Sequence, residues 1–146
     1  MLKKLLTFIK NPLGGPKFDP SRIDSIISEG MIVEGTVTYS GTLVINGTLK
    51  GTIVKAPGSK TPYGIIVGKT GVVDCEAGIE ADFLINNGVI SASINTQNLL
   101  KLEANSITSG TEIKYGELTI AKSAVTWGLF KSSKYVTALI DRNLVS

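Results

Sequence analysis

The chain of 146 residues contains no histidine and only one cysteine, Cys75. Histidine is the side chain that most often serves as a general base and as a ligand for transition metals. A single cysteine excludes an intramolecular disulfide. These absences disfavour most triad and metal chemistries, so we expect a protein that is not an enzyme, with no catalytic residue, no metal site and no cofactor.

Aromatic residues are also scarce, at 6% of the chain against 42% hydrophobic residues overall. The net charge is only +3, and the lysines do not form a basic stripe with interleaved aromatics, so we expect no nucleic-acid partner. Glu76 and Glu80 are interpreted as solvated charges rather than as a catalytic pair. Cys75 occupies a small-residue position of its repeat, matching Gly51 and Ala92, which favours an inert buried thiol over a reactive one.

A unit of about 17 to 18 residues recurs between about Ile26 and Phe130, and a period of this length is typical of solenoid proteins. Each unit contains three apolar positions separated by small or turn-forming residues. The first position is an alternating pair, as expected for a strand: Leu43 and Ile45, Ile65 and Val67, Phe83 and Ile85, Leu100 and Leu102, Leu118 and Ile120. The second position is Leu49, Val73, Ile90, Ile107 and Val125, and the third is Ile53, Ile79, Ile94, Ile113 and Leu129.

Three short apolar faces per unit cannot bury their side chains alone, but successive coils can stack around a shared interior. The repeat therefore predicts an all-β, single-domain, three-sided β-solenoid of about six coils, counting a less regular first coil around Met31, Ile32 and Val37. At about 4.8 Å between stacked strands, the rod is about 30 Å long. We divide the chain into an N-terminal segment (1–15), the solenoid (16–130) and a C-terminal tail (131–146).

The repeat is interrupted once, between Ile53 and Ile65. The intervening residues 55–63 are rich in proline, glycine and serine. Solenoids tolerate such insertions at their corners. We therefore expect a surface loop at one corner, whose role the sequence leaves open.

The first ten residues, MLKKLLTFIK, differ in character from the solenoid. At helical spacing Leu2, Leu5, Leu6 and Ile9 share one sector, and lysines flank it. This pattern favours a helix in the interface of an anionic membrane, although packing against the solenoid is the alternative. It is too short to span a bilayer and lacks the pattern of a secretory signal. The membrane-binding residues that we predict are Leu2, Lys3, Lys4, Leu5, Leu6, Phe8, Ile9 and Lys10.

At the other end, the repeat closes with Trp127, Leu129 and Phe130. Solenoids need a polar cap to remain monomeric, whereas this end is aromatic and apolar. We predict that these three residues form a polymerisation interface. Residues 131–146 could cap the last coil, be disordered or bind a partner, and the sequence does not choose among these.

Three stretches resemble the bactofilins, a family of bacterial cytoskeletal proteins: LVINGTLKGTI, IIVGKTGVVDCEAGIEA and ELTIAKSAVTWGLF. The resemblance covers roughly Gly30 to Phe130. It implies a right-handed β-helix that polymerises end to end without a nucleotide, with a membrane-binding N-terminal segment. The loop at Lys55 to Tyr63 and the lack of long charged or Pro-rich tails depart from many members.

We therefore expect a cytoplasmic filament protein, peripheral on the inner face of the cell membrane. Its expected partners are further copies of itself, membrane lipids and cell-wall or envelope proteins that it scaffolds. Two alternatives are an acyltransferase of the hexapeptide-repeat type and a monomeric β-solenoid binding module. The first usually needs a histidine base, which is absent here. Filament polarity and the identity of the scaffolded proteins are not evident from the sequence.

Overall fold

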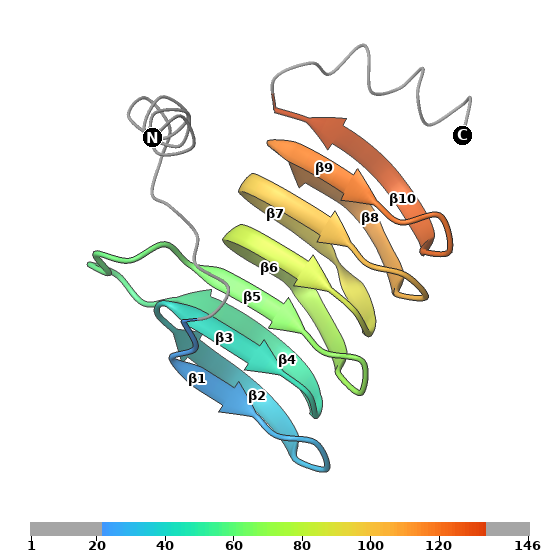
Figure 1. The fold of residues 1–146 in the computed structure, drawn as a ribbon. Coiled ribbons are helices and arrows are strands. Elements are labelled where there is room, and N and C mark those ends of the chain that lie inside the picture. Colours follow the sequence, from blue (N-terminus) through green and yellow to red (C-terminus); the bar gives the residue numbers. More distant parts are fainter. Residues whose placement is uncertain (1–21, 134–146) are drawn as a thin grey trace, which may run out of the picture.

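The computed structural model describes residues 22–133, which form ten β-strands and no helix (Figure 1). All the pairings among these strands are parallel, and the chain coils so that each coil stacks on the one before it. The strands are β1 (Ser25–Ile27), β2 (Ile32–Tyr39), β3 (Thr42–Ile45), β4 (Thr48–Lys55), β5 (Gly64–Val67), β6 (Val72–Asn86), β7 (Val89–Leu102), β8 (Ile107–Tyr115), β9 (Glu117–Ile120) and β10 (Val125–Ser132). The prediction of an all-β solenoid is confirmed.

The pairings define six coils and three faces. The first face contains residues 25–27, 42–45, 64–67, 83–86, 99–102 and 117–120. The second face contains residues 32–34, 48–50, 72–75, 89–92, 107–109 and 125–127. The third contains residues 36–39, 52–55, 79–81, 94–96, 112–115 and 129–132.

Aliphatic side chains stack in rows inside the solenoid. Because alternate residues of a strand point to opposite sides, each face sends one set of side chains into a shared interior. The rows join residues of successive coils that are buried almost completely: Leu43, Ile65, Leu84 and Leu100 on the first face, Leu49, Val73 and Ile90 on the second, and Ile79, Ile94 and Ile113 on the third. Burial of this continuous aliphatic column is the main stabilising term of the fold.

In three coils the inward position differs by one residue from our expectation. Leu84 and Asn86 point inward on the first face in place of Phe83 and Ile85. On the second face, Thr108 and Thr126 continue the inward row in place of Ile107 and Val125. On the third face, Phe130 aligns with Ile113, while Leu129 aligns with Glu112 and points outward.

Hydrogen bonding explains the polar inward positions. Asn86 is fully buried, and its amide donates to the Ile107 carbonyl oxygen at 3.1 Å and to Thr108 Oγ1 at 2.8 Å. Its Oδ1 accepts from the Gly88 amide at 2.9 Å. A buried amide with all these partners costs little. Hydrophobic pattern alone therefore assigned the wrong residues to the interior here.

The inserted segment lies between β4 and β5, at the corner that joins the third face to the first. Its last residue, Tyr63, is anchored: the backbone amide donates to Asp82 Oδ2 at 2.8 Å, and the hydroxyl donates to the Ala56 carbonyl oxygen. The Tyr63 ring meets the ring of Tyr39 edge to face, with 5.7 Å between centroids, and Lys55 Nζ lies 5.3 Å from the Tyr63 centroid. At the start of the loop the Ala56 amide donates to the Tyr39 carbonyl oxygen at 2.7 Å, so the predicted corner loop is tied to the solenoid at both ends.

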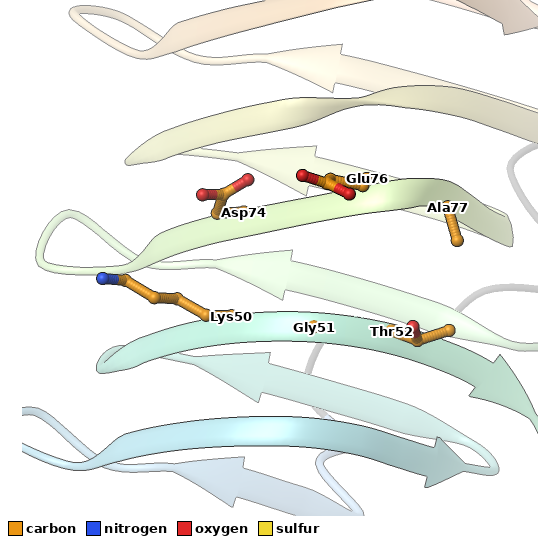
Figure 2. Close-up of a pocket in the computed structure, with 6 residues that line it drawn as sticks. All are labelled: Lys50, Gly51, Thr52, Asp74, Glu76 and Ala77. Carbon is orange, nitrogen blue, oxygen red and sulfur yellow. The ribbon is translucent and has the colours of Figure 1, made fainter.

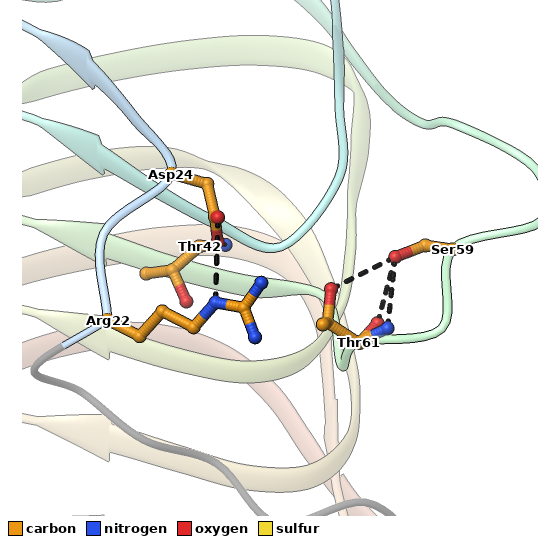
Figure 3. A network of polar contacts seen from close by, with 5 residues as sticks. All are labelled: Arg22, Asp24, Thr42, Ser59 and Thr61. Atoms are coloured by element: carbon orange, nitrogen blue, oxygen red, sulfur yellow. Dashed lines mark hydrogen bonds and ion pairs between the residues drawn. The ribbon is translucent and has the colours of Figure 1, made fainter.

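A polar network lies where the described chain begins (Figure 3). Asp24 Oδ2 accepts a hydrogen bond from the Thr42 backbone amide at 2.8 Å, and the Asp24 amide donates to the Thr42 carbonyl oxygen at 3.0 Å. Arg22 Nε lies 3.6 Å from Asp24 Oδ1. Within the loop, the Ser59 hydroxyl donates to the Thr61 carbonyl oxygen at 3.0 Å. Asp24 thus extends the parallel ladder before β1 starts.

Candidate assembly surfaces

Open strand edges lie at both ends of the described solenoid. At one end β1 pairs only with β3, and β2 pairs only with β4. At the other end β9 pairs only with β7, and β10 only with β8. Within residues 22–133, one side of each of these four strands therefore has no partner strand. Such edges are the usual template for pairing with another chain.

Exposed apolar side chains concentrate in the same two terminal coils. In the interior coils 41–116, the only large exposed hydrophobic residues are Val54, Val72 and Ile107. The remaining ones among the described residues belong to the terminal coils: Ile23, Ile26, Met31 and Ile32 at one end, and Ile120, Val125, Trp127 and Leu129 at the other. Apolar surface gathered in this way marks candidate interaction sites.

Ile120 is exposed for a reason that differs from that of the outward-facing residues of the last coil. It aligns with Leu102, which is fully buried, and so occupies an inward row of the first face. Yet 43% of Ile120 is exposed, because no further strand of the described solenoid stacks beyond β9. One more coil on this end would bury Ile120 as the present coils bury Leu102.

The three residues predicted to form the polymerisation interface lie in different environments. Trp127 and Leu129 are exposed, at 62% and 47%, and both lie in outward rows of β10. Phe130 is only 4% exposed and belongs to the hydrophobic core. The polymerisation interface itself stays a prediction. Phe130 would contribute to it by packing inside the end coil. The predicted membrane-binding residues lie outside the described part of the chain, as does most of the tail 131–146.

Chemical groups suited to catalysis are sparse among the described residues. Cys75 is completely buried, as expected, and burial together with the negative charge of Asp74 raises the pKa of its thiol to about 11. Glu76 and Glu80 are exposed, and Glu80 lies 3.7 Å from Lys55 Nζ. Residues 22–133 contain no group of three or more acidic, cysteine or histidine residues placed to hold a metal ion.

A shallow depression lies at the corner between the second and third faces (Figure 2). It forms beside β6, where three residues, Glu76 to Gly78, bulge out of register between Cys75 and Ile79. Lys50 and Asp74 project from neighbouring coils along its rim, and Glu76 projects beside them. One ammonium and two carboxylates in an open depression do not define a binding site for a specific ligand.

Residues 22–133 form a parallel β-solenoid whose first and last coils carry exposed apolar side chains, so the fold defines a protein of the β-solenoid class. The family model named Bactofilin, described as polymer-forming cytoskeletal, matches residues 25–131. The chain therefore belongs to the bactofilin family, and its family role is structural: the formation of filaments. No curated protein and no solved structure matched the chain. Within residues 22–133, no helix has the length and apolarity needed to cross a membrane.

Proposed function

We propose that this protein forms cytoskeletal filaments without a nucleotide, by stacking the terminal coils of successive subunits. The observation that supports this most directly is the concentration of exposed apolar residues in the first and last coils. Stacking would give the outer edge of β9, or those of β1 and β2, a partner strand, and it would bury Ile120 at the junction. No bound ligand is needed to create either surface.

We further propose that the filaments attach to the inner face of the cell membrane through Met1–Lys10 and scaffold envelope or cell-wall proteins. The support for attachment is the sequence pattern of an apolar stripe flanked by lysines. A filament carries one such segment per subunit. Membrane binding by the filament can therefore be strong even if each segment binds weakly. A structural role also agrees with the family membership, which favours it over enzymatic activity.

The stacking proposal is tested by placing a charge at the exposed end of an inward row. Ile120→Lys should leave the solenoid folded but prevent growth, because the ammonium group would have to be desolvated at each junction. Val54→Lys is the matched control, since Val54 is 41% exposed on the third face, away from both ends. Sedimentation and negative-stain electron microscopy should show filaments for the wild type and the control only.

Two results would contradict this proposal. One is assembly of the wild type that requires ATP, GTP or a divalent cation. The other is unimpaired filament growth by Ile120→Lys with an unchanged circular dichroism spectrum. If Val54→Lys also stopped assembly, the junction would not be confined to the ends.

A further inference from the structure

The first face carries an apolar surface on its outer side. Five apolar residues of the second to fifth coils lie in its two outward rows: Val44, Ile66, Phe83, Ile85 and Leu99. We call these five residues the first-face patch. Each is next to a completely buried residue of the same strand, so by alternation it points away from the core.

Part of the first-face patch is shielded from water although it lies outside the core. Val44 and Phe83 are each 8% exposed, and the outward-facing Thr42 is 5% exposed. Val72 lies in an outward row of the second face, with a neighbour in the coil before it and in the coil after it, as Val44 has, and Val72 is 38% exposed. Neighbours in the row therefore do not account for the burial of Val44, and the first face has a cover that the second face lacks.

We propose that this cover is the chain's own segment 16–21, which precedes the described residues and docks on the first-face patch as an extended chain. Its sequence, PKFDPS, alternates apolar and polar residues. In an extended chain such residues point to opposite sides. Pro16, Phe18 and Pro20 would then face the patch, and the polar residues between them would face water. The two prolines already restrict the chain, which lowers the entropy lost on docking.

The segment joins the solenoid directly beside the first-face patch. The Asp24 amide donates to the Thr42 carbonyl oxygen at 3.0 Å, and Asp24 Oδ2 accepts from the Thr42 amide at 2.8 Å, so the chain enters at the start of the first face (Figure 3). The coil of Phe83 lies three spacings of about 4.8 Å, or about 14 Å, from Asp24. At about 3.3 Å per residue, Phe18 can extend about 20 Å from Asp24 and so reaches that coil. Gly64 is aligned between Thr42 and Phe83 and has no side chain, which leaves room for the Phe18 ring.

Two other segments border the first face. The corner loop 55–63 joins the third face to the first, but its Tyr63 ring packs edge to face against Tyr39 of the third face. The tail after Ser133 leaves from the last coil. Towards that end the outward rows of the first face finish with polar residues: Lys101, Glu117 and Thr119. The apolar surface lies nearer the N-terminal entry, which favours the segment 16–21 as its occupant.

Docking would also fix the side of the subunit from which the first ten residues emerge. Residues 11–15 span at most about 18 Å when fully extended, so Met1–Lys10 would stay close to the first face. The first face would then be turned toward the membrane. This consequence rests on the membrane attachment proposed above, whereas the docking itself does not.

Limited proteolysis of the full chain with trypsin tests the docking. The bond after Lys17 lies within the docked segment, and the bond after Lys10 lies before it and serves as the internal reference. Ile66→Glu places a charge in the first-face patch. It should raise the rate of cleavage after Lys17, relative to that after Lys10, by about tenfold or more, because the protease acts on the undocked state.

Two further variants make this test specific. Val72→Glu adds the same charge to an outward position of the second face and should leave the ratio of the two cleavage rates as in the wild type. Phe18→Ser weakens docking from the segment, without a change in the solenoid, and should raise the ratio as Ile66→Glu does. Circular dichroism and thermal unfolding of each variant confirm that the solenoid is intact.

Introduced cysteines identify the occupant. In a Cys75→Ala background, Pro16→Cys combined with Ile85→Cys should form a disulfide within one chain on mild oxidation. Pro16→Cys combined with Val89→Cys is the matched control, because Val89 points outward from the same coil on the second face, and it should not form the disulfide. Non-reducing electrophoresis and mass spectrometry distinguish a disulfide within one chain from one between two chains.

Rapid cleavage after Lys17 in the wild type would overturn the docking, as would an unchanged ratio in both Ile66→Glu and Phe18→Ser. An equal rise in Val72→Glu would show a general effect of charge and would also overturn it. A disulfide between two chains would assign the patch to the segment of a second copy and overturn docking within one chain. Failure of the protein to bind vesicles, with the cleavage and disulfide results as expected, would contradict only the membrane attachment.

Discussion

Gly51 stacks directly on Gly35 at the corner between the second and third faces. A Cβ atom added to Gly51 would lie 1.9 Å from the Gly35 carbonyl oxygen, and the Gly51 φ angle of +146° is one that residues with a side chain rarely adopt. Both the close approach of two coils and the backbone conformation therefore require glycine at this position.

We expect Gly51→Ala to destabilise the solenoid by more than about 4 kcal/mol, since it combines backbone strain with a steric overlap that only displacement of a coil can relieve. Gly35→Ala is the matched control: its φ is +121°, but a Cβ there would meet nothing within 4 Å. The control should show strain alone, about 1 to 3 kcal/mol. Urea unfolding measured by circular dichroism provides both values, and equal losses would show that the overlap at Gly51 is relieved at no cost.

The thiol of Cys75 predicts a specific dependence of stability on pH. Its pKa rises from 9.0 to about 11 on folding, chiefly because burial disfavours the thiolate. Below pH 9 the thiol is neutral in both the folded and the unfolded state, and its full contribution to the free energy of unfolding is present. Above pH 9 the unfolded thiol ionises first, so the free energy of unfolding falls until the pH passes about 11.

Cys75→Ala removes this titration while keeping a small side chain, as at Ala92 in the next coil. Between pH 9 and 11, the free energy of unfolding should fall more steeply for the wild type than for Cys75→Ala. Tyr39, whose pKa is also raised by burial, is present in both proteins and so does not affect the comparison. Parallel curves across this range would mean that Cys75 ionises equally in the folded and unfolded states.

The period, the three faces and the corner loop were predictable from sequence, because apolar residues separated by small residues recur at nearly constant spacing. The orientation of individual side chains was predictable only where the inward residue is aliphatic. Asn86 and Thr108 are buried through mutual hydrogen bonding across neighbouring coils. That pairing depends on register, which no local pattern reveals.

The same limit hid the outward orientation of Ile107 and Val125. Ile107 and Val125 were assigned to the core because each follows a small residue of its repeat by two positions, whereas the structure buries the neighbour of Ile107, which is a threonine. Apolar side chains usually point into the core and polar ones outward. A strand in which isoleucine or valine points outward beside an inward threonine reverses this arrangement. Such reversed pairs in successive coils are a signal that could have shown which side chains of the second face point outward.

The environments of Phe130 and Leu129 predict opposite effects for the same substitution. Phe130→Arg places a guanidinium group where the native side chain is 4% exposed, so we expect the last coil to unfold and stability to fall by several kcal/mol. Leu129→Arg adds the charge at an outward position aligned with Glu112, and stability should stay within about 0.5 kcal/mol.

If Leu129 contributes to the junction between subunits, Leu129→Arg should also shorten the filaments while the fold is retained. Thermal unfolding together with sedimentation separates these effects. A folded Phe130→Arg variant that forms only short oligomers would instead place Phe130 directly in the junction. If Leu129→Arg forms filaments of normal length, Leu129 does not belong to the junction between subunits.

The final prediction concerns membrane attachment by the N-terminal segment. Insertion of apolar side chains and attraction of lysines to anionic headgroups each supply only part of the binding free energy. Deleting residues 1–10 should therefore abolish flotation with vesicles of anionic phospholipid, while filaments still form. The pair Leu5→Gln and Leu6→Gln should weaken flotation at every salt concentration. The pair Lys3→Gln and Lys4→Gln should weaken it mainly at low salt, where electrostatic attraction is least screened. If the deleted protein floats as well as the full chain, another part of the protein binds the membrane; if the deletion also abolishes filaments, the segment is needed for assembly.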